Sequence, residues 1–132
     1  MYQYLAIIRK VIDGDTLEID IDLGLSVWVQ KEKVRLYGIN TPEVYGVKKG
    51  TPEWEEGNKA SEFVKSVLKE NDEIRIETIK DKKEKYGRYL AIVYVRIDLN
   101  IIEGLSEIRN IGDFYCINDI LIGKGLAKAY MI

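Results

Sequence analysis

The sequence predicts an α+β domain that is mainly β: a five-stranded barrel of the OB type, with one main amphipathic helix and a short C-terminal helix. Its 132 residues, 46% of them hydrophobic, are enough to bury one core without cross-links. Patterns typical of three strands are followed by a helical pattern and then by two more strands, the order expected of such a barrel. We therefore predict one domain over residues 1–132.

The N-terminal region predicts a hairpin of two strands. Residues 4–12 are rich in apolar and β-branched side chains, and residues 16–22 alternate apolar with acidic or polar side chains. Asp13-Gly14 between them is a strong hairpin signal. The simplest interpretation of the Asp-Gly-Asp motif is therefore a turn, which leaves Asp15 at the start of the second strand.

The third strand is predicted over residues 26–39, with a bend near its charged middle. Pro42 ends it, because proline has no amide donor and biases the preceding residue towards extended backbone. We therefore expect Asn40 and Thr41 to lie in a turn and not in a sheet ladder, with their carbonyls available to other partners. Arg35 alternates with apolar neighbours, so its side chain should leave the barrel surface.

The main helix is predicted over residues 53–71, where apolar side chains recur at the spacing of one helical face. That face consists of Ala60, Phe63, Val64, Val67 and Leu68. Two strands follow, at residues 73–79 and 89–97, joined by the charged hairpin of residues 80–88.

Residues 98–116 fit either one helical turn or an irregular hairpin. We interpret them as a loop that covers the core. The alternative is an interface with a partner or a second copy, formed by an exposed apolar patch. The candidates for that patch are Ile101, Ile102, Leu105 and Phe114.

The C-terminal residues 117–132 predict a short helix with Asn118 or Asp119 as its N-cap. It should pack on the core through three consecutive apolar residues. These are Ile120, Leu121 and Ile122.

Composition excludes several function classes. The only cysteine is Cys116 and there is no histidine, so a disulfide framework, a Cys/His zinc site and the Ser-His and Cys-His nucleophile pairs are all excluded. The net charge of −2 means that any contact with nucleic acid must be local. The N-terminus resembles neither a signal peptide nor a membrane span, so we expect a cytoplasmic protein without membrane contact.

Oxygen ligands near two predicted turns suggest a cation site. Calcium accepts carboxylates, amide carbonyls and backbone carbonyls, and Asp15, Asn40 and the Thr41 carbonyl meet this specification. Glu43 follows the same turn and would be a neighbouring carboxylate. The site requires that the two turns meet in space.

Basic residues suggest phosphate binding. Guanidinium groups bind phosphate oxygens with two hydrogen bonds and stabilise charge that develops on phosphorus, so Arg35 and Arg88 are candidates. Taken singly, each is more commonly an ordinary surface arginine. Lys85 and Tyr86 in the basic hairpin would add charge and a ring that can stack on a base, although such hairpins are usually just solvated.

Taken together, four segments resemble the staphylococcal nuclease family across nearly the whole chain. They are VIDGDT at 11–16, VRLYGINTPE at 34–43, KYGRYLAIVYV at 85–95 and INDILIGKGLAKAY at 117–130. The resemblance implies an OB-fold barrel and a calcium-dependent phosphodiesterase that cuts DNA and RNA, single-stranded in preference, and leaves 3′-phosphates. It also implies an insertion at about residues 98–116, and we expect a monomer.

Residue roles follow from this resemblance, position by position. Asp15 and Thr41 match metal ligands, and Glu43 matches the residue that positions or deprotonates the attacking water. Arg35 and Arg88 match the phosphate-binding arginines. The substrate-binding positions are Lys85 and Tyr86 in the hairpin and Tyr130 near the base pocket.

Asn40 departs from the family pattern, which has a second metal-binding aspartate at this position. Asparagine keeps an oxygen ligand but removes one negative charge, so calcium binding should be weaker. The alternative function is therefore a catalytically weakened OB module that binds nucleic acid or protein.

Overall fold

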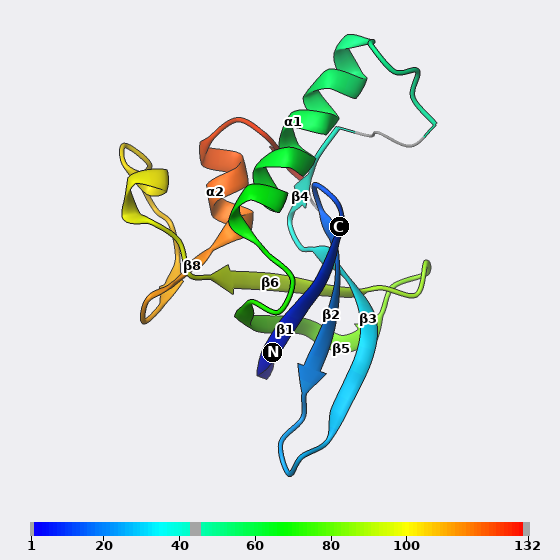
Figure 1. Ribbon diagram of the computed structural model, residues 1–132, viewed down its shortest axis with the longest axis vertical. Helices are drawn as coiled ribbons and strands as arrows, with labels where there is room; N and C mark the ends of the chain where they lie inside the picture. Colours follow the sequence, from blue (N-terminus) through cyan, green and yellow to red (C-terminus); the bar gives the residue numbers. More distant parts are fainter. Residues whose placement is uncertain (1, 43–45, 131–132) are drawn as a thin grey trace.

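Five long strands close into a barrel in the computed structural model, which describes residues 2–42 and 46–130 and, for residues 80–82, the backbone only (Figure 1). The strands are β1 (Tyr2–Asp13), β2 (Thr16–Asp22), β3 (Trp28–Leu36), β5 (Glu73–Lys83) and β6 (Tyr89–Val95). They pair in the order β3-β2-β1-β5-β6, and a parallel pairing of β6 with β3 closes the ring. The predicted five-stranded barrel is confirmed.

The first three strands agree with their patterns. In the β1–β2 hairpin, Asp13 pairs with Thr16 across the predicted turn. β3 bends at Lys31, which has a positive φ of 57° and lies where the pairing of β2 with β3 shifts register. The bend in the charged middle of this strand is thus a β-bulge, which increases local twist and helps a sheet to close.

The prediction that Asn40 lies outside any sheet ladder is wrong. Ile39–Asn40 form the short strand β4, which pairs antiparallel with β9 (Lys128–Ala129), and Asn40 lies opposite Lys128. Pro42 does end the extended segment as expected, and Thr41 is outside the strand. The partner strand comes from the end of the chain, so local pattern gave no sign of the pairing.

The main helix α1 (Pro52–Val67) begins after Thr51, whose hydroxyl accepts the Trp54 amide at 3.3 Å. It ends at Val67, and the following residue, Leu68, is its C-cap and donates its amide to the Val64 carbonyl. The helix is thus shorter than predicted. The predicted apolar face is confirmed: its members are buried or packed against the core. Gly57 is also buried.

Gly14 is needed for close packing between the β1–β2 turn and its neighbours. A Cβ at this position would lie 3.0 Å from the Ala60 Cβ and 3.0 Å from the Thr41 Oγ1. Contacts this short force a shift of the surrounding atoms. The glycine therefore lets α1 and the segment after β4 approach the turn that carries Asp15.

Gly14→Ala should lower the free energy of unfolding by about 1–3 kcal/mol, because the added methyl overpacks this contact. Urea unfolding monitored by circular dichroism measures it. Gly14→Ala combined with Ala60→Gly should recover part of the loss beyond what the two separate changes predict. Strict additivity would contradict the proposed contact.

Residues 98–116 contain both a helical turn and a hairpin, the two structures that their sequence fitted equally. A 3₁₀ turn, η1 (Leu99–Ile102), precedes a short hairpin of β7 (Asn110–Ile111) and β8 (Phe114–Cys116), and β8 extends the sheet beside β6. The core-covering interpretation is confirmed, because the four apolar candidates are buried or packed against a core cluster and form no exposed patch.

The C-terminal helix α2 (Ile117–Gly123) is capped by a residue that we did not predict. Cys116 is the N-cap, and its Sγ accepts the Asp119 amide at 3.4 Å. Asn118 is instead buried and bonds to the backbone of β6 and of Tyr37. Ile120 and Leu121 are buried as expected, whereas Ile122 is 40% exposed.

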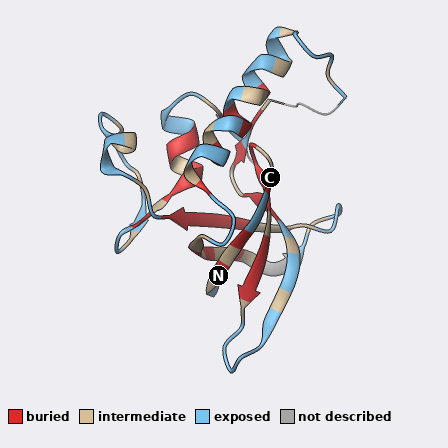
Figure 2. Cartoon of the chain, in the orientation of Figure 1, coloured by how far each residue is buried: buried red, intermediate tan, exposed pale blue. Residues whose placement is uncertain are grey.

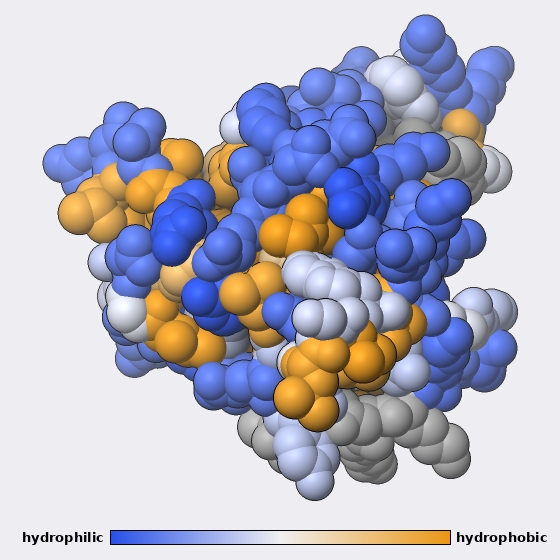
Figure 3. Space-filling model, turned by 60° about the horizontal axis from the view of Figure 1, so that its bottom comes forward, coloured by the Kyte–Doolittle hydropathy of each residue, from blue (hydrophilic) through white to orange (hydrophobic). Residues whose placement is uncertain are grey.

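The core fills the barrel and continues under the two helices, as the red strand interiors in Figure 2 show. Apolar surface remains on the face seen in Figure 3, and Leu23, Leu25, Val27 and Trp28 around the β2–β3 turn are exposed. Within residues 2–42 and 46–130, no helix combines the length and the apolar character needed to cross a membrane.

Candidate functional site

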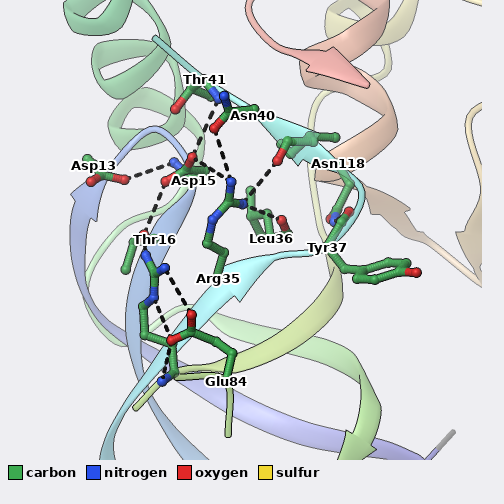
Figure 4. A network of polar contacts seen from close by, with 12 residues as sticks. Asp13, Asp15, Thr16, Arg35, Leu36, Tyr37, Asn40, Thr41, Glu84 and Asn118 are labelled. Carbon is green, nitrogen blue, oxygen red and sulfur yellow. Dashed lines mark hydrogen bonds and ion pairs between the residues drawn. The ribbon is translucent and has the colours of Figure 1, made fainter. Parts of the chain in front are cut away.

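The predicted site residues Asp15, Arg35, Asn40 and Thr41 meet at one end of the barrel (Figure 4). The Arg35 Nη2 lies 3.1 Å from the Asn40 Oδ1 and 3.5 Å from the Asp15 Oδ2. The Thr41 amide donates to the same Asp15 oxygen at 3.4 Å. The two turns that carry candidate oxygen ligands therefore do lie side by side.

Arg35 leaves the apolar face of β3 as predicted, but its side chain is buried, with 10% of it exposed. Its Nη1 donates to the carbonyls of Leu36 at 2.8 Å and Ile39 at 3.0 Å. The guanidinium thus holds the chain between β3 and β4 in shape while it faces Asp15 and Asn40. A single planar group with several donors is suited to this role.

Asp15 is a buried carboxylate with several donors around it. Burial alone would raise its pKa, but the hydrogen bond from Asp13, the Arg35 charge, the Thr41 amide and the Thr16 hydroxyl together hold the pKa of Asp15 below its usual value. The charged form is therefore stable inside the protein. An anionic oxygen at this place is what a cation requires.

Asp13 has the opposite behaviour. Burial, together with a shared hydrogen bond and the negative charge of Asp15, raises the pKa of Asp13 to about 6. Its Oδ1 also accepts the Asp15 amide at 3.1 Å. The folded protein therefore binds a proton at Asp13 more tightly than the unfolded chain does, so stability falls as pH rises from about 4 to about 6.

Asp13→Asn should raise the free energy of unfolding by about 1 kcal/mol at pH 7.5 and leave it unchanged at pH 4, because the amide keeps the acceptor and removes the charge. The figure allows for solvent screening of a half-buried group. Urea unfolding in EDTA at both pH values measures it. Equal effects at the two pH values would contradict this account.

Arg88 lies on the β6 side of the basic hairpin and is held by Glu84. Two Arg88 nitrogens donate to this carboxylate, Nε to Oε1 at 3.1 Å and Nη2 to Oε2 at 3.3 Å. Burial opposes the Glu84 charge, but Arg88 and two backbone amides lower the pKa of Glu84 below its usual value. Glu84 is therefore ionised opposite Arg88 at neutral pH.

Arg88 reaches the same site as Arg35 through Thr16. The Arg88 Nη1 donates to the Thr16 Oγ1 at 3.3 Å, and this hydroxyl donates to the Asp15 Oδ1 at 3.1 Å. Sequence reasoning missed both Thr16 and Glu84. The only signals were the position of Thr16 directly after the turn and the opposite charge of Glu84 four residues before Arg88.

The predicted substrate-binding residues are on the surface near these groups. The Tyr86 ring is 70% exposed, and its centroid lies 5.0 Å from the Lys85 Nζ and 5.6 Å from the Arg88 Cζ. Tyr130 is 48% exposed, and its amide donates to the Gly38 carbonyl at 2.8 Å, next to β4. Glu43 lies outside the described residues, so its role stays a prediction.

A hollow of about 270 Å³ adjoins the site between β4, α1 and β9. Asn40 and Thr41 line it together with Glu53, Glu56 and Lys128. Pro42, Leu126 and Ala127 add apolar lining, and the hollow lies beside the site towards the first turns of α1.

The donor chemistry of the site fits calcium. Asp15 and Asn40 each present an oxygen to the same Arg35 nitrogen, and carboxylate and amide oxygens are ligands that calcium accepts. The described part of the chain contains no cluster of three or more Asp, Glu or Cys side chains placed to hold a metal ion.

Fold and site define the class of protein: an OB barrel with two arginines and a buried carboxylate gathered at one end of the barrel. A family model described as staphylococcal nuclease homologue matches residues 33–132. The chain belongs to the staphylococcal nuclease family, which confirms the resemblance inferred from its motifs.

Similar proteins include two thermonucleases and an endonuclease. The chain is 39% identical to a thermonuclease of Staphylococcus intermedius over 93% of this chain and 70% of that protein. It is 40% identical to a thermonuclease of Staphylococcus hyicus over 65% of this chain and 46% of that protein. Endonuclease YhcR of Bacillus subtilis is 29% identical over 82% of this chain, which spans 8% of that protein.

Proposed function

We propose that this protein is a calcium-dependent nuclease that hydrolyses phosphodiester bonds of DNA and RNA to 3′-phosphate products. One observation carries the proposal: three segments of the chain, which hold Asp15, Arg35 with Asn40, and Arg88, are joined in one continuous network. The network consists of hydrogen bonds, two of them through Thr16, and of the ion pair between Arg35 and Asp15. Membership of the nuclease family supports it.

The residues present divide the work of the reaction. Asp15, Asn40 and the Thr41 carbonyl would hold calcium, which supplies positive charge to the reacting phosphate when bound. Arg88 and Arg35 orient the phosphate and stabilise the charge that grows on its oxygens. Glu43 takes the proton of the attacking water.

The two arginines are prepared differently for this task. Glu84 and Thr16 occupy three of the five N–H groups of Arg88, so within the described contacts one N–H on each terminal nitrogen remains for a phosphate. The terminal nitrogens of Arg35 already contact Leu36, Ile39, Asn40 and Asp15. Arg88 can therefore bind first. Arg35, whose Nε alone has no partner among the described contacts, must exchange a contact before it can bind a phosphate with two hydrogen bonds.

Digestion of single-stranded DNA across a calcium titration tests the proposal. We expect calcium-dependent cleavage with 3′-phosphate ends, identified by mass spectrometry of the fragments. The same assay with RNA and with duplex DNA tests the proposed preference for single strands. Absence of cleavage at every calcium concentration, with intact binding, would overturn the proposal.

A binding module without catalysis is the second candidate, and one observation favours it. Asn40 is uncharged and its Oδ1 already accepts from Arg35, so it has a structural role that needs no metal. This candidate predicts nucleic-acid binding in EDTA that calcium does not change.

We further propose that the protein is monomeric and cytoplasmic.

Asn40→Asp should shift the calcium concentration for half-maximal activity about three- to tenfold lower, because it restores one ligand charge beside Asp15. The measurement is the initial cleavage rate across a calcium titration. Glu56→Gln, which removes one charge from the lining of the adjoining hollow, is the control. An unchanged calcium requirement would mean that Asn40 is not a ligand.

A further inference from the structure

Thr16 connects the two halves of the site. It is 3% exposed and lies at the first position of β2, directly after Asp15. Its single hydroxyl contacts a carboxylate on one side and a guanidinium on the other, at 3.1 Å from the Asp15 Oδ1 and 3.3 Å from the Arg88 Nη1. No other described side chain bonds to both residues.

The direction of these two hydrogen bonds is fixed by chemistry. A guanidinium has only donors and an ionised carboxylate has only acceptors. The one hydroxyl proton must therefore go to Asp15, and a lone pair on the oxygen must accept from Arg88. When Arg88 donates to the Thr16 oxygen, it polarises the hydroxyl and strengthens the hydrogen bond from Thr16 to Asp15. The bond to Asp15 likewise strengthens the bond from Arg88, so the two contacts favour each other.

Two side chains, Glu84 and Thr16, hold the guanidinium of Arg88. Glu84 takes the Nε side of the guanidinium, and Thr16 takes its far nitrogen, so together they fix the plane of the group. Asp15 is likewise fixed on its Oδ2 by the Thr41 amide and Arg35 and on its Oδ1 by Thr16. Thr16 therefore belongs both to the contacts that hold Arg88 and to those that hold Asp15.

We propose that Thr16 is a positioning residue that couples phosphate binding at Arg88 to cation binding at Asp15. The inference rests on the proposed function, because it assigns those ligands to the two residues. When Arg88 is held by a phosphate, the Thr16 oxygen and its proton are held in the geometry that orients the Asp15 carboxylate. Coupling is reciprocal, so a cation at Asp15 also favours phosphate binding at Arg88.

A merely structural role is the competing explanation, since a buried hydroxyl needs hydrogen-bond partners in any case. That role predicts lower stability and equal losses in every ligand affinity when the hydroxyl is removed. Coupling predicts instead that each ligand loses its effect on the other. The two explanations therefore differ in the ratio of calcium affinity with nucleotide to calcium affinity without it. General destabilisation lowers both affinities and leaves this ratio unchanged.

The experiment measures calcium affinity by isothermal titration calorimetry, without and with saturating thymidine 5′-monophosphate, which has a phosphate but no phosphodiester to cut. We expect the nucleotide to raise calcium affinity at least about fivefold in the wild-type protein. Thr16→Val, which keeps the shape and removes the hydroxyl, should reduce this factor to near one. Thr16→Ser, which restores the hydroxyl, should retain it.

Thr78→Val is the matched control, because Thr78 is a buried threonine on β5 at 2% exposure. It should lower stability without changing the coupling factor. Circular dichroism confirms folding of each variant, and Thr16→Ala replaces Thr16→Val if the valine variant does not fold. Nucleotide affinity in EDTA, measured for the same set, should change less than threefold, a loss below that of a typical hydrogen bond.

Each outcome decides the matter. A coupling factor equal in Thr16→Val and wild type overturns the inference and leaves the proposed nuclease intact, provided that cleavage still depends on calcium. Loss of coupling in Thr78→Val as well also overturns it, because the effect is then general. A wild-type protein that binds no calcium overturns both the inference and the metal part of the proposed function.

Discussion

Glu43→Gln is expected to lower kcat for single-stranded DNA by about 10²–10⁴-fold, the usual contribution of a general base. The amide keeps the size and the hydrogen-bonding capacity of the side chain but takes up no proton. Nucleic-acid binding should be retained, because the arginines proposed to contact phosphate are unchanged. The measurement is single-turnover cleavage at saturating calcium, with binding followed by fluorescence anisotropy.

Glu53→Gln is the control for this variant, since Glu53 is an exposed carboxylate at the start of α1 that lines the adjoining hollow. Its effect on kcat should be less than threefold, consistent with a surface charge outside the reacting groups. Equal cleavage by wild type and Glu43→Gln would contradict the proposed mechanism. Equal losses of kcat in Glu43→Gln and Glu53→Gln would mean that Glu43 acts only through its charge and not as a general base.

Arg35→Lys should lower kcat by about 10³-fold or more, because a single ammonium cannot provide the planar fork that stabilises charge on the transferred phosphate. It should also lower the free energy of unfolding by about 2–4 kcal/mol, since one ammonium nitrogen cannot lie at the places of both terminal nitrogens. One of these contacts the carbonyls of Leu36 and Ile39 and the other contacts Asp15. Cleavage assays and urea unfolding measure the two effects separately.

Arg88→Lys is the comparison for Arg35→Lys, because the side chain of Arg88 is more open, at 22% exposure against 10%. We expect a similar loss of kcat but a stability change below about 1 kcal/mol, because lysine keeps a positive charge opposite the partly buried Glu84. Comparison of the two variants thereby separates the effect on catalysis from the effect on the stability of the β3–β4 segment. Equal stability losses would contradict the structural role assigned to Arg35.

The periodic elements were predictable because their signal is local. Alternation in residues 16–22 and the helical spacing of Ala60, Val64 and Val67 arise from the burial of one face, and a single stretch of chain records that burial. The barrel order followed from the succession of these elements. The predicted turn at Asp13-Gly14 was equally local.

Errors occurred where a distant segment supplied the partner. Asn40 joins a ladder because Lys128 arrives opposite it, and Asn118 leaves the cap position because β6 and Tyr37 offer it buried backbone partners. Cys116 then takes the cap through a local contact, because its sulfur accepts the Asp119 amide three residues later. For Asn40 and Asn118, tertiary contacts outweighed the local preference.

By itself, the sequence determined the barrel, the main helix and the residue types that phosphate chemistry requires, because burial patterns and functional groups are properties of the chain. Only the tertiary structure decided that Arg35 is buried between β3 and β4, that Glu84 holds Arg88, and that Thr16 links Arg88 to Asp15. These contacts join residues that are separated in the sequence, or depend on side-chain directions set by such neighbours. Their geometry therefore exists only once the barrel has closed.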